Sequence, residues 1–248
     1  MRRFLFTGLA ILVLSISIAR EAAACECTER PGPCTAFTRD DVVFVGRVVD
    51  MIRAEEPTIL IGLTVRFEIE QPFKGLSVTR RTVDVKTGAE SGDCGYDFKP
   101  GQRYLVFASQ AHGSLYTSIC TNNQPISDAQ DDIELINALR SGRAETRIFG
   151  RILLEEKTAA SPAEIKPPAL AGMRVEARNA STVLFNTTDA DGRYQIKNVP
   201  PGRYVIRVVG PFPPDLNVWQ EVPQNVDIRL PSNCGGRVNF PAYVRARR

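Results

Sequence analysis

The chain has 248 residues, 43% hydrophobic and 24% charged, and its 31 basic and 28 acidic side chains nearly balance. Without residues 1–24 the balance is 28 basic against 27 acidic side chains, a net charge of +1, and we expect no nucleic-acid partner. The hydrophobic content is enough for one large core or two smaller ones.

The N-terminal segment has the pattern of a secretory signal. A positive start precedes an apolar run at residues 4–19, and three alanines at 22–24 are the small residues that signal peptidase cleaves after. A membrane anchor is the alternative, but the run is shorter than the roughly 20 residues that span a bilayer. We predict a signal peptide over residues 1–24 and a secreted, extracellular or periplasmic chain beginning at Cys25. Acylation of Cys25 would instead make it a surface lipoprotein, the one case in which we expect membrane attachment.

The cysteines indicate disulfides, because thiols outside the cytoplasm are usually oxidised. Cys25 and Cys27 are too close to bridge each other easily, so each should bond a distant cysteine. Zinc is the competing interpretation, but paired zinc cysteines usually have two to four residues between them, and His112 is the only histidine. We expect no cofactor and no metal of the protein's own. The six cysteines are Cys25, Cys27, Cys34, Cys94, Cys120 and Cys234.

The first half reads as short strands followed by one helix. Ser127 to Gln130 fits a capping box, apolar residues then recur at helical spacing, and Gly142 stands where the helix should stop. Five strands and a closing helix predict a small OB-type barrel, which we assign to residues 25–144. The strands are expected at residues 41–49, 63–69, 82–86, 104–108 and 115–119.

The second half, residues 145–248, shows seven strand patterns and no helical one, which predicts a seven-stranded β-sandwich. Turn signals at 189–192 and 200–202 join successive strands. The strands are expected at residues 148–154, 173–177, 182–185, 193–196, 204–209, 226–230 and 237–240.

Catalytic motifs are missing from the sequence. With a single histidine there is no HExxH helix, and no G-x-S-x-G elbow occurs. His112 reads as a hairpin-tip residue, and Asp189 to Gly192 as a β-turn rather than a calcium loop. We therefore expect no enzyme, and binding becomes the default function.

Cys25-x-Cys27, Asp41-Val-Val-Phe-Val-Gly46, Phe73-Lys-Gly75, Cys94-Gly95 and Lys99 to Leu105 together resemble the netrin-like module of tissue inhibitors of metalloproteinases. The resemblance implies an OB-type barrel in which Cys25 bonds Cys94 and Cys27 bonds Cys120. Cys34 has no evident partner within this half. Either it forms a bridge to Cys234, or it remains a free thiol or bonds another molecule.

The second half resembles the carboxypeptidase regulatory-like domain, a transthyretin-like sandwich whose fold is also called carbohydrate-binding-like. Ile148 to Ile152, Leu170 to Val175, Thr187 to Tyr194 and Val199 to Tyr204 carry this resemblance.

In the inhibitors that the first half resembles, the α-amine and carbonyl of the N-terminal cysteine chelate the catalytic zinc of the target protease. The resemblance implies an inhibitory edge of Cys25, Glu26 and Cys27, with Cys25 as the ligand. Glu26 departs from the family, which places a small hydroxyl or apolar side chain there; a carboxylate in an apolar pocket needs a cation or a hydrogen-bond partner.

We predict an exported, non-enzymatic two-domain binding or scaffold protein of the cell envelope or extracellular space. The first alternative is an inhibitor of zinc metalloproteases acting through Cys25. The second is a carbohydrate-binding module in residues 145–248. The expected partner is accordingly a protein, an extracellular zinc metalloprotease in the first alternative, or a glycan in the second.

Overall fold

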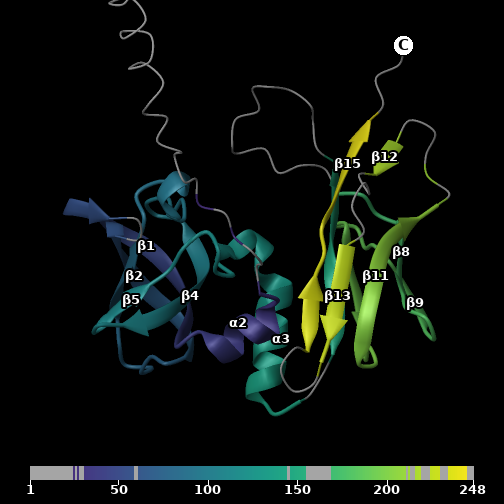
Figure 1. The fold of residues 1–248 in the computed structure, drawn as a ribbon, viewed down its shortest axis with the longest axis horizontal. Coiled ribbons are helices and arrows are strands. Elements are labelled where there is room, and N and C mark those ends of the chain that lie inside the picture. The colour runs from purple at the N-terminus through teal and green to yellow at the C-terminus, as the bar shows by residue number, and fades with distance from the viewer. Residues whose placement is uncertain are drawn as a thin grey trace, which may run out of the picture.

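The computed structural model describes residues 25, 27, 31–58, 61–143, 146–154, 169–210, 212, 216–218, 224–229 and 234–244. The predicted signal peptide and Glu26 lie outside these ranges. Among the described residues, no helix is long and apolar enough to cross a membrane. The protein is mainly β, as the sequence predicts. Its strands form two groups (Figure 1), which we call the first β part, residues 25–143, and the second β part, residues 146–244.

The first β part holds one six-stranded sheet in the order β1-β2-β3-β5-β4-β6. Because β1 also pairs antiparallel with β4, the pairings β1–β2–β3–β5–β4–β1 form a closed circuit. Four of the five strands expected here are present as β1 to β4, the fifth is reduced to the three residues of β5 because residues 117–119 lie outside the strand, and β6 is additional. The elements are α2 (Pro33–Arg39), β1 (Val42–Thr58), β2 (Ile61–Lys74), β3 (Thr82–Thr87), η2 (Ser91–Asp93), β4 (Arg103–Ala111), β5 (Ser114–Tyr116), β6 (Gln124–Pro125), η3 (Ile126–Asp128) and α3 (Gln130–Arg140).

Strand β1 begins with an unbroken apolar run because both of its faces are buried. Val42 and Phe44 pack in a cluster with β2, β3 and β4, whereas Val43 and Val45 pack in a second cluster with residues of α2 and α3. Successive side chains of a strand point to opposite faces, so a strand with one polar face would alternate. The run therefore reflects the helices that cover the second face.

The helices correct the sequence prediction in two places. Helix α2 was not predicted, because its seven residues, PCTAFTR, are too few to show a helical period; Pro33 occupies its first turn. Helix α3 lies where predicted, with Gly142 past its end at φ 71°. The capping box is wrong: Ala129 is the N-cap, no side chain caps the helix, and Ser127 lies in η3.

The second β part holds two sheets, in the orders β10-β7-β15-β12, with β14 also paired to β7, and β13-β11-β8-β9. One buried cluster joins side chains from both sheets, including Ile148, Val175, Tyr204 and Phe240. The strands are β7 (Arg147–Leu154), β8 (Arg174–Arg178), β9 (Val183–Thr187), β10 (Arg193–Lys197), β11 (Gly202–Val209), β12 (Leu216–Val218), β13 (Gln224–Ile228), β14 (Gly235–Arg237) and β15 (Phe240–Val244).

The single strand expected at residues 237–240 is wrong, because β14 ends at Arg237 and β15 begins at Phe240. The two residues between these strands, Val238 and Asn239, accept hydrogen bonds that are not part of a strand ladder. The Tyr194 hydroxyl donates to the carbonyl of Val238 at 2.8 Å, and the side-chain oxygen of Asn239 accepts the N–H of Arg151 at 3.0 Å. Because of this break, and because β12 was not foreseen, the described part of residues 146–244 contains nine strands rather than seven.

The two β parts meet across α2 and α3, which lie between them (Figure 1). Leu135 of α3 shares one buried cluster with Phe149 of β7, Cys34 of α2 and Cys234 before β14. The two cysteines form a disulfide with their Cα atoms 5.6 Å apart. The sequence did not decide between this disulfide and a free or intermolecular Cys34 thiol; the structure contains the disulfide.

Candidate functional site

The N-terminal cysteines are held on two loops of the first β part. Cys25 bonds Cys94, with 5.1 Å between their Cα atoms, and Cys27 bonds Cys120, with 5.4 Å between theirs. These are the pairings that the resemblance implied. We call Cys25, Cys27 and residues 31–33 the ridge, and the loops around Cys94 and Cys120 its anchor loops; Glu26 and residues 28–30 fall outside the described residues.

The Cys94 loop is organised by the carboxylate of Asp93. It accepts backbone N–H groups from Ala89 at 2.7 Å, Glu90 at 2.8 Å and Gly95 at 3.2 Å. Burial opposes ionisation, but these N–H donors outweigh it and hold the pKa of Asp93 below its ordinary value. Cys94 itself has φ 65°, a conformation uncommon outside glycine.

Gly95 is required by a close approach of two chain segments. A Cβ at this position would lie 2.4 Å from the carbonyl oxygen of Gly88, well inside van der Waals contact. Two residues before Cys94, by contrast, a Cβ on Gly92 would meet nothing within 4 Å. The loop is therefore packed on the side of Gly95 and open at Gly92.

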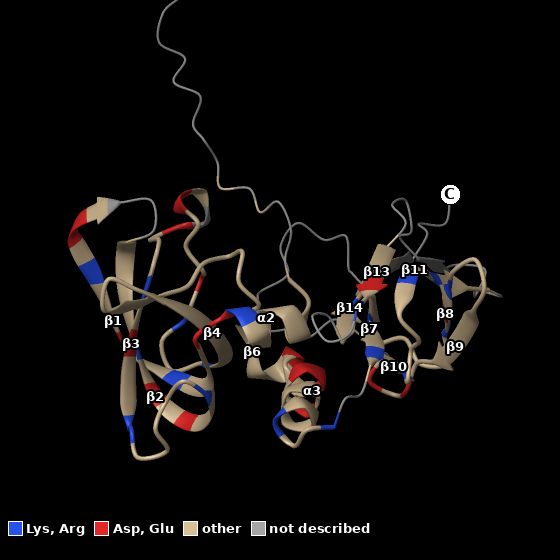
Figure 2. Cartoon of the chain, turned by 60° about the horizontal axis from the view of Figure 1, so that its bottom comes forward, with Lys and Arg blue, Asp and Glu red and all other residues tan. Residues whose placement is uncertain are grey.

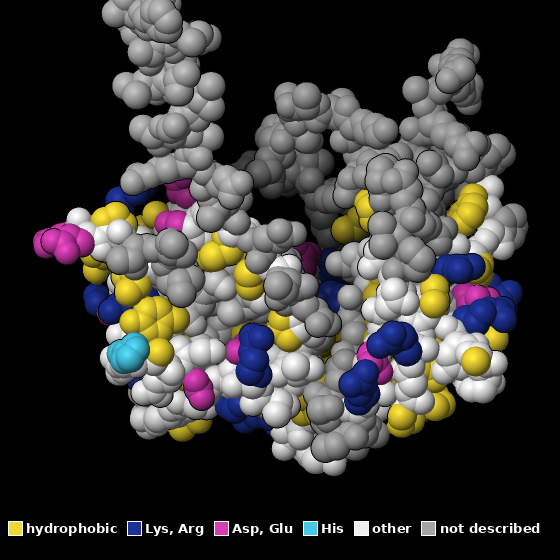
Figure 3. Space-filling model, viewed as in Figure 1, with side chains coloured by type: hydrophobic (Ala, Val, Ile, Leu, Met, Phe, Trp, Pro, Cys, Tyr) yellow, Lys and Arg dark blue, Asp and Glu magenta, His cyan; other side chains and the backbone are white. Residues whose placement is uncertain are grey.

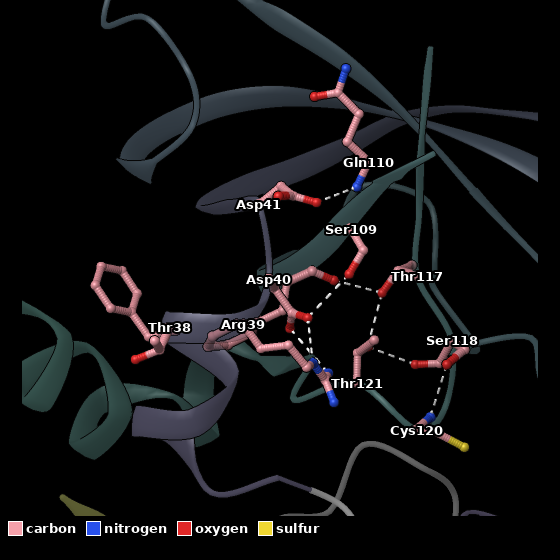
Figure 4. Close-up of polar contacts among 12 residues, drawn as sticks. Thr38, Arg39, Asp40, Asp41, Ser109, Gln110, Thr117, Ser118, Cys120 and Thr121 are labelled. Atoms are coloured by element: carbon pink, nitrogen blue, oxygen red, sulfur yellow. Dashed lines mark hydrogen bonds and ion pairs between the residues drawn. The ribbon is translucent and has the colours of Figure 1, made fainter. Parts of the chain in front are cut away.

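The Cys120 loop is fixed by side-chain hydrogen bonds, and Figure 4 shows those among Thr117, Ser118, Cys120 and Thr121. Thr117 also donates its hydroxyl to the carbonyl of Phe107 at 2.7 Å, and Asn123 accepts the N–H of Phe107 at 2.8 Å. Ser118 accepts the N–H of Cys120 at 3.1 Å. The two anchor loops also touch, because the N–H of Ile119 donates to the carbonyl of Cys94 at 3.0 Å. Both anchors of the ridge thus belong to one hydrogen-bonded unit.

All six cysteines are in disulfides, so none is available as a thiolate nucleophile or zinc ligand. Across the described residues, no group of three His, Cys, Asp or Glu side chains could hold a metal ion. The histidine lies at the surface (Figure 3), at the tip of the β4–β5 hairpin with φ 47°, as predicted. Asp189 accepts the N–H groups of Asp191 and Arg193, which makes the predicted turn.

A charged interface between the two β parts was not foreseen from the sequence. Four arginines of the second β part form ion pairs with acidic residues of η3 and α3. Figure 2 shows α3 beside β7 and β10. The pairs are Arg147–Glu134 at 3.7 Å, Arg151–Asp128 at 3.1 Å, Arg237–Asp132 at 2.8 Å, and Arg193 with Asp131.

Asp132 is the most buried member of this interface, with a fully buried side chain. One of its oxygens, Oδ2, accepts from Arg237 at 2.8 Å, Asn122 at 2.8 Å and Gln124 at 2.5 Å. The other oxygen has no hydrogen-bond partner among the described residues. Burial raises the pKa of Asp132, against the opposing effect of Arg237 and the two amides. The helical pattern of the sequence did not indicate that Asp132 is buried, because a charged residue at this position of α3 is typical of a solvent-exposed helix surface.

No family model and no curated protein matches the chain. Solved structures similar to it include the major plantain pollen allergen Pla l 1, at 17% identity and TM-score 0.31, covering 42% of this chain and 98% of that one. They also include GBS52, the minor pilin of Streptococcus agalactiae, at 11% identity and TM-score 0.32, covering 84% of this chain and 85% of that one. The Bacillus anthracis TIE protein scores 0.28 at 11% identity, covering 82% of this chain and 35% of that one. Scores this low assign neither fold nor function.

Proposed function

We propose that the protein is an exported, non-enzymatic binding protein in which the two β parts act as one rigid body that presents the ridge to a protein partner. In this proposal the first β part is an OB-type barrel like that of the tissue inhibitors of metalloproteinases, and the second is a carboxypeptidase regulatory-like sandwich. Residues 1–24 direct export, and the domains divide between residues 144 and 145.

The observation that carries the proposal is the doubly fastened interface. The Cys34–Cys234 disulfide joins the parts covalently, and the arginine–carboxylate pairs fix their orientation around it. A binding surface that is already ordered loses less conformational entropy when its partner arrives. The closed circuit of strand pairings and the disulfides of Cys25 and Cys27 support the inhibitor-like barrel.

A photo-cross-linking side chain at Gly92 tests whether the ridge faces a partner. Gly92 is exposed next to the Cys94 anchor, and a side chain there has open space. Ala171, exposed in a turn of the second β part, is the matched control position. Irradiation in the producing cells should give one discrete protein adduct from position 92 and none from position 171. Equal adducts from both positions, or none from either, would contradict the proposal.

Inhibition of a zinc metalloprotease is the second candidate, favoured by the bond between Cys25 and Cys94 in a loop that three backbone donors hold to Asp93. The free α-amine of a processed Cys25 has a pKa of about 7.7–8.0, so zinc binding at neutral pH releases at most about one proton. The amine and carbonyl would displace the zinc-bound water of the protease.

The processed protein, a variant with one alanine before Cys25, and Glu26→Thr should be compared against a panel of extracellular zinc proteases. Inhibition should vanish in the extended variant, because its amine no longer sits at the anchored cysteine. It should strengthen in Glu26→Thr, since the carboxylate is no longer desolvated in the pocket. Inhibition that survives the extension, or none from any of the three proteins, would rule out this mechanism.

A further inference from the structure

An open cleft of about 640 Å³ lies on the first β part where β3 and β5 diverge. Among the described residues these two strands pair at only two positions, Val85 with Leu115 and Lys86 with Tyr116. Earlier in β3, Thr82 to Asp84 keep the ladder to β2 on one side only. The opening is a consequence of this short pairing, and its volume falls within the roughly 300–1,000 Å³ of ligand sites.

The residues around the cleft come from β1, β2, the loop after β2, β3 and the β4–β5 hairpin, which the strand order brings together. On the outer face of β2 and β3, Thr64 lies opposite Lys86 and Arg66 opposite Asp84. The loop after β2 adds Arg80, and the β4–β5 hairpin adds polar and apolar side chains described below.

The cleft carries an excess of positive charge. Arg66 and Asp84 neutralise each other through two hydrogen bonds, Nε to Oδ1 at 2.8 Å and Nη2 to Oδ2 at 2.9 Å. These bonds lower the pKa of Asp84, so it stays ionised near neutral pH. Lys86 and Arg80 form no salt bridge among the described residues. Arg80 is near enough to Asp84 to help lower its pKa, so the three cations Arg66, Arg80 and Lys86 exceed the one carboxylate by two charges. Arg80 uses Nε to hold the carbonyl of Thr82 at 3.1 Å, which orients its two terminal nitrogens.

Hydroxyls and apolar groups lie beside these cations. Ser114, Thr64 and Thr82 offer hydroxyls, and Leu76 and Leu115 offer half-buried apolar surface. Gln110 is fixed through its backbone N–H, which donates to Asp41 at 2.7 Å, while its side-chain amide points away from that contact (Figure 4). Alternating hydroxyl, amide and aliphatic surface suits the hydroxyls and C–H faces of a sugar ring, and the two cations suit an acidic substituent.

We propose that this cleft binds an anionic saccharide, with Lys86 and Arg80 on its carboxylate or sulfate group and the hydroxyls of Thr64, Thr82 and Ser114 on the sugar hydroxyls. The site lies in the first β part, whereas the resemblance of the second part to a carbohydrate-binding-like fold pointed to residues 145–248. It does not depend on which partner the ridge has, because Gly92 and the ridge cysteines do not line it.

Calorimetric titration of the full mature protein tests this site with four probes of matched length: trigalacturonate, sulfated maltotriose, neutral maltotriose and triglutamate. Either acidic sugar should bind saturably, and the one that binds identifies the acidic group. Lys86→Gln and Arg80→Gln should each weaken that binding about tenfold or more, as expected for a lost charged hydrogen bond. Lys99→Gln, which removes an exposed lysine outside the cleft, should leave it unchanged.

Neutral maltotriose should bind at least tenfold more weakly than the acidic sugar, since it cannot engage the two cations. Binding of triglutamate that equals that of the acidic sugar would overturn the saccharide assignment. No saturable binding of either acidic sugar, or equal loss in Lys86→Gln and Lys99→Gln, would overturn the site. Both Lys86 and Arg80 project outward from the core, so circular dichroism of the variants should match that of the parent protein.

Discussion

Replacing Arg237 by methionine removes the cation that faces the most buried carboxylate of the interface. Arg237 donates from Nη2 to Asp132 at 2.8 Å and to Asn122 at 2.7 Å, and its side chain is 22% exposed while that of Asp132 is 0% exposed. Removing one partner of a buried pair typically costs about 3–5 kcal/mol, because the remaining charge stays desolvated. For a protein of this size the loss corresponds to a melting temperature lower by about 10 °C.

The pH dependence of this loss distinguishes charge from packing. Burial raises the pKa of Asp132 and Arg237 opposes that rise, so the pKa in Arg237→Met should be higher still. A carboxyl whose folded-state pKa is raised destabilises the fold as pH increases through that pKa, and at lower pH it is protonated and carries no uncompensated charge. The loss of stability in Arg237→Met should therefore be largest near neutral pH and shrink in acid.

Urea unfolding of both proteins at about pH 4 and about pH 7.5 measures the difference at each pH. Arg103→Met is the matched control, because Arg103 pairs with Glu70 with side chains 45% and 24% exposed. An exposed pair of this kind is worth about 0–1 kcal/mol. A loss in Arg237→Met no greater than that of the control, or one that is the same at both pH values, would refute the electrostatic account.

Three further predictions concern the disulfide and the anchor loops. Replacing both Cys34 and Cys234 by serine should cost about 2–5 kcal/mol, measured by urea unfolding under non-reducing conditions, and an unchanged midpoint would contradict a structural role for the bridge. Gly95→Ala should lower the free energy of unfolding by about 1–3 kcal/mol, whereas Gly92→Ala should change it by no more than about 0.5 kcal/mol. Equal effects of the two substitutions would show that the contact between Gly95 and the carbonyl of Gly88 is not tight. Asp93→Asn should lower the melting temperature near neutral pH and lose this effect in acid. A carboxyl whose pKa is lowered by folding stabilises the fold above its unfolded-state pKa, and this stabilisation disappears as the pH falls through the folded-state pKa. An effect of Asp93→Asn that does not change with pH would refute this account.

Strand positions could be predicted because their pattern is local. Strands β1 to β4 of the first β part follow β-branched and aromatic runs, and β1 shows its double burial as an unbroken apolar stretch. Helix α2 escaped prediction because seven residues hold less than two full turns. The break between β14 and β15 escaped because it depends on Tyr194 and Arg151, which bond Val238 and Asn239 from elsewhere in the chain.

The disulfides of the ridge were anticipated through a family pattern, whereas the charged interface was not. Arg237 and Asp132 are 105 residues apart in the chain. Each is a charged residue of a type that is mostly exposed, and only the packing of α3 beside β14, where Arg237 lies, turns them into a buried pair. The cleft between β3 and β5 likewise depends on how far two strands stay paired, which side-chain patterns do not encode.

The order of the three disulfides has a consequence for how the protein is made. In chain order the cysteines pair first with fourth, second with fifth and third with sixth, and the last bond spans 200 residues. If the chain is exported as proposed and oxidised as it emerges, cysteines close in sequence, such as Cys27 and Cys34, would be available to each other first. Cys34 could reach its native partner Cys234 only after almost the whole polypeptide has emerged. In that case, thiol–disulfide exchange must reopen the early mispairs, and the yield of native protein should depend on a disulfide isomerase in the oxidising compartment.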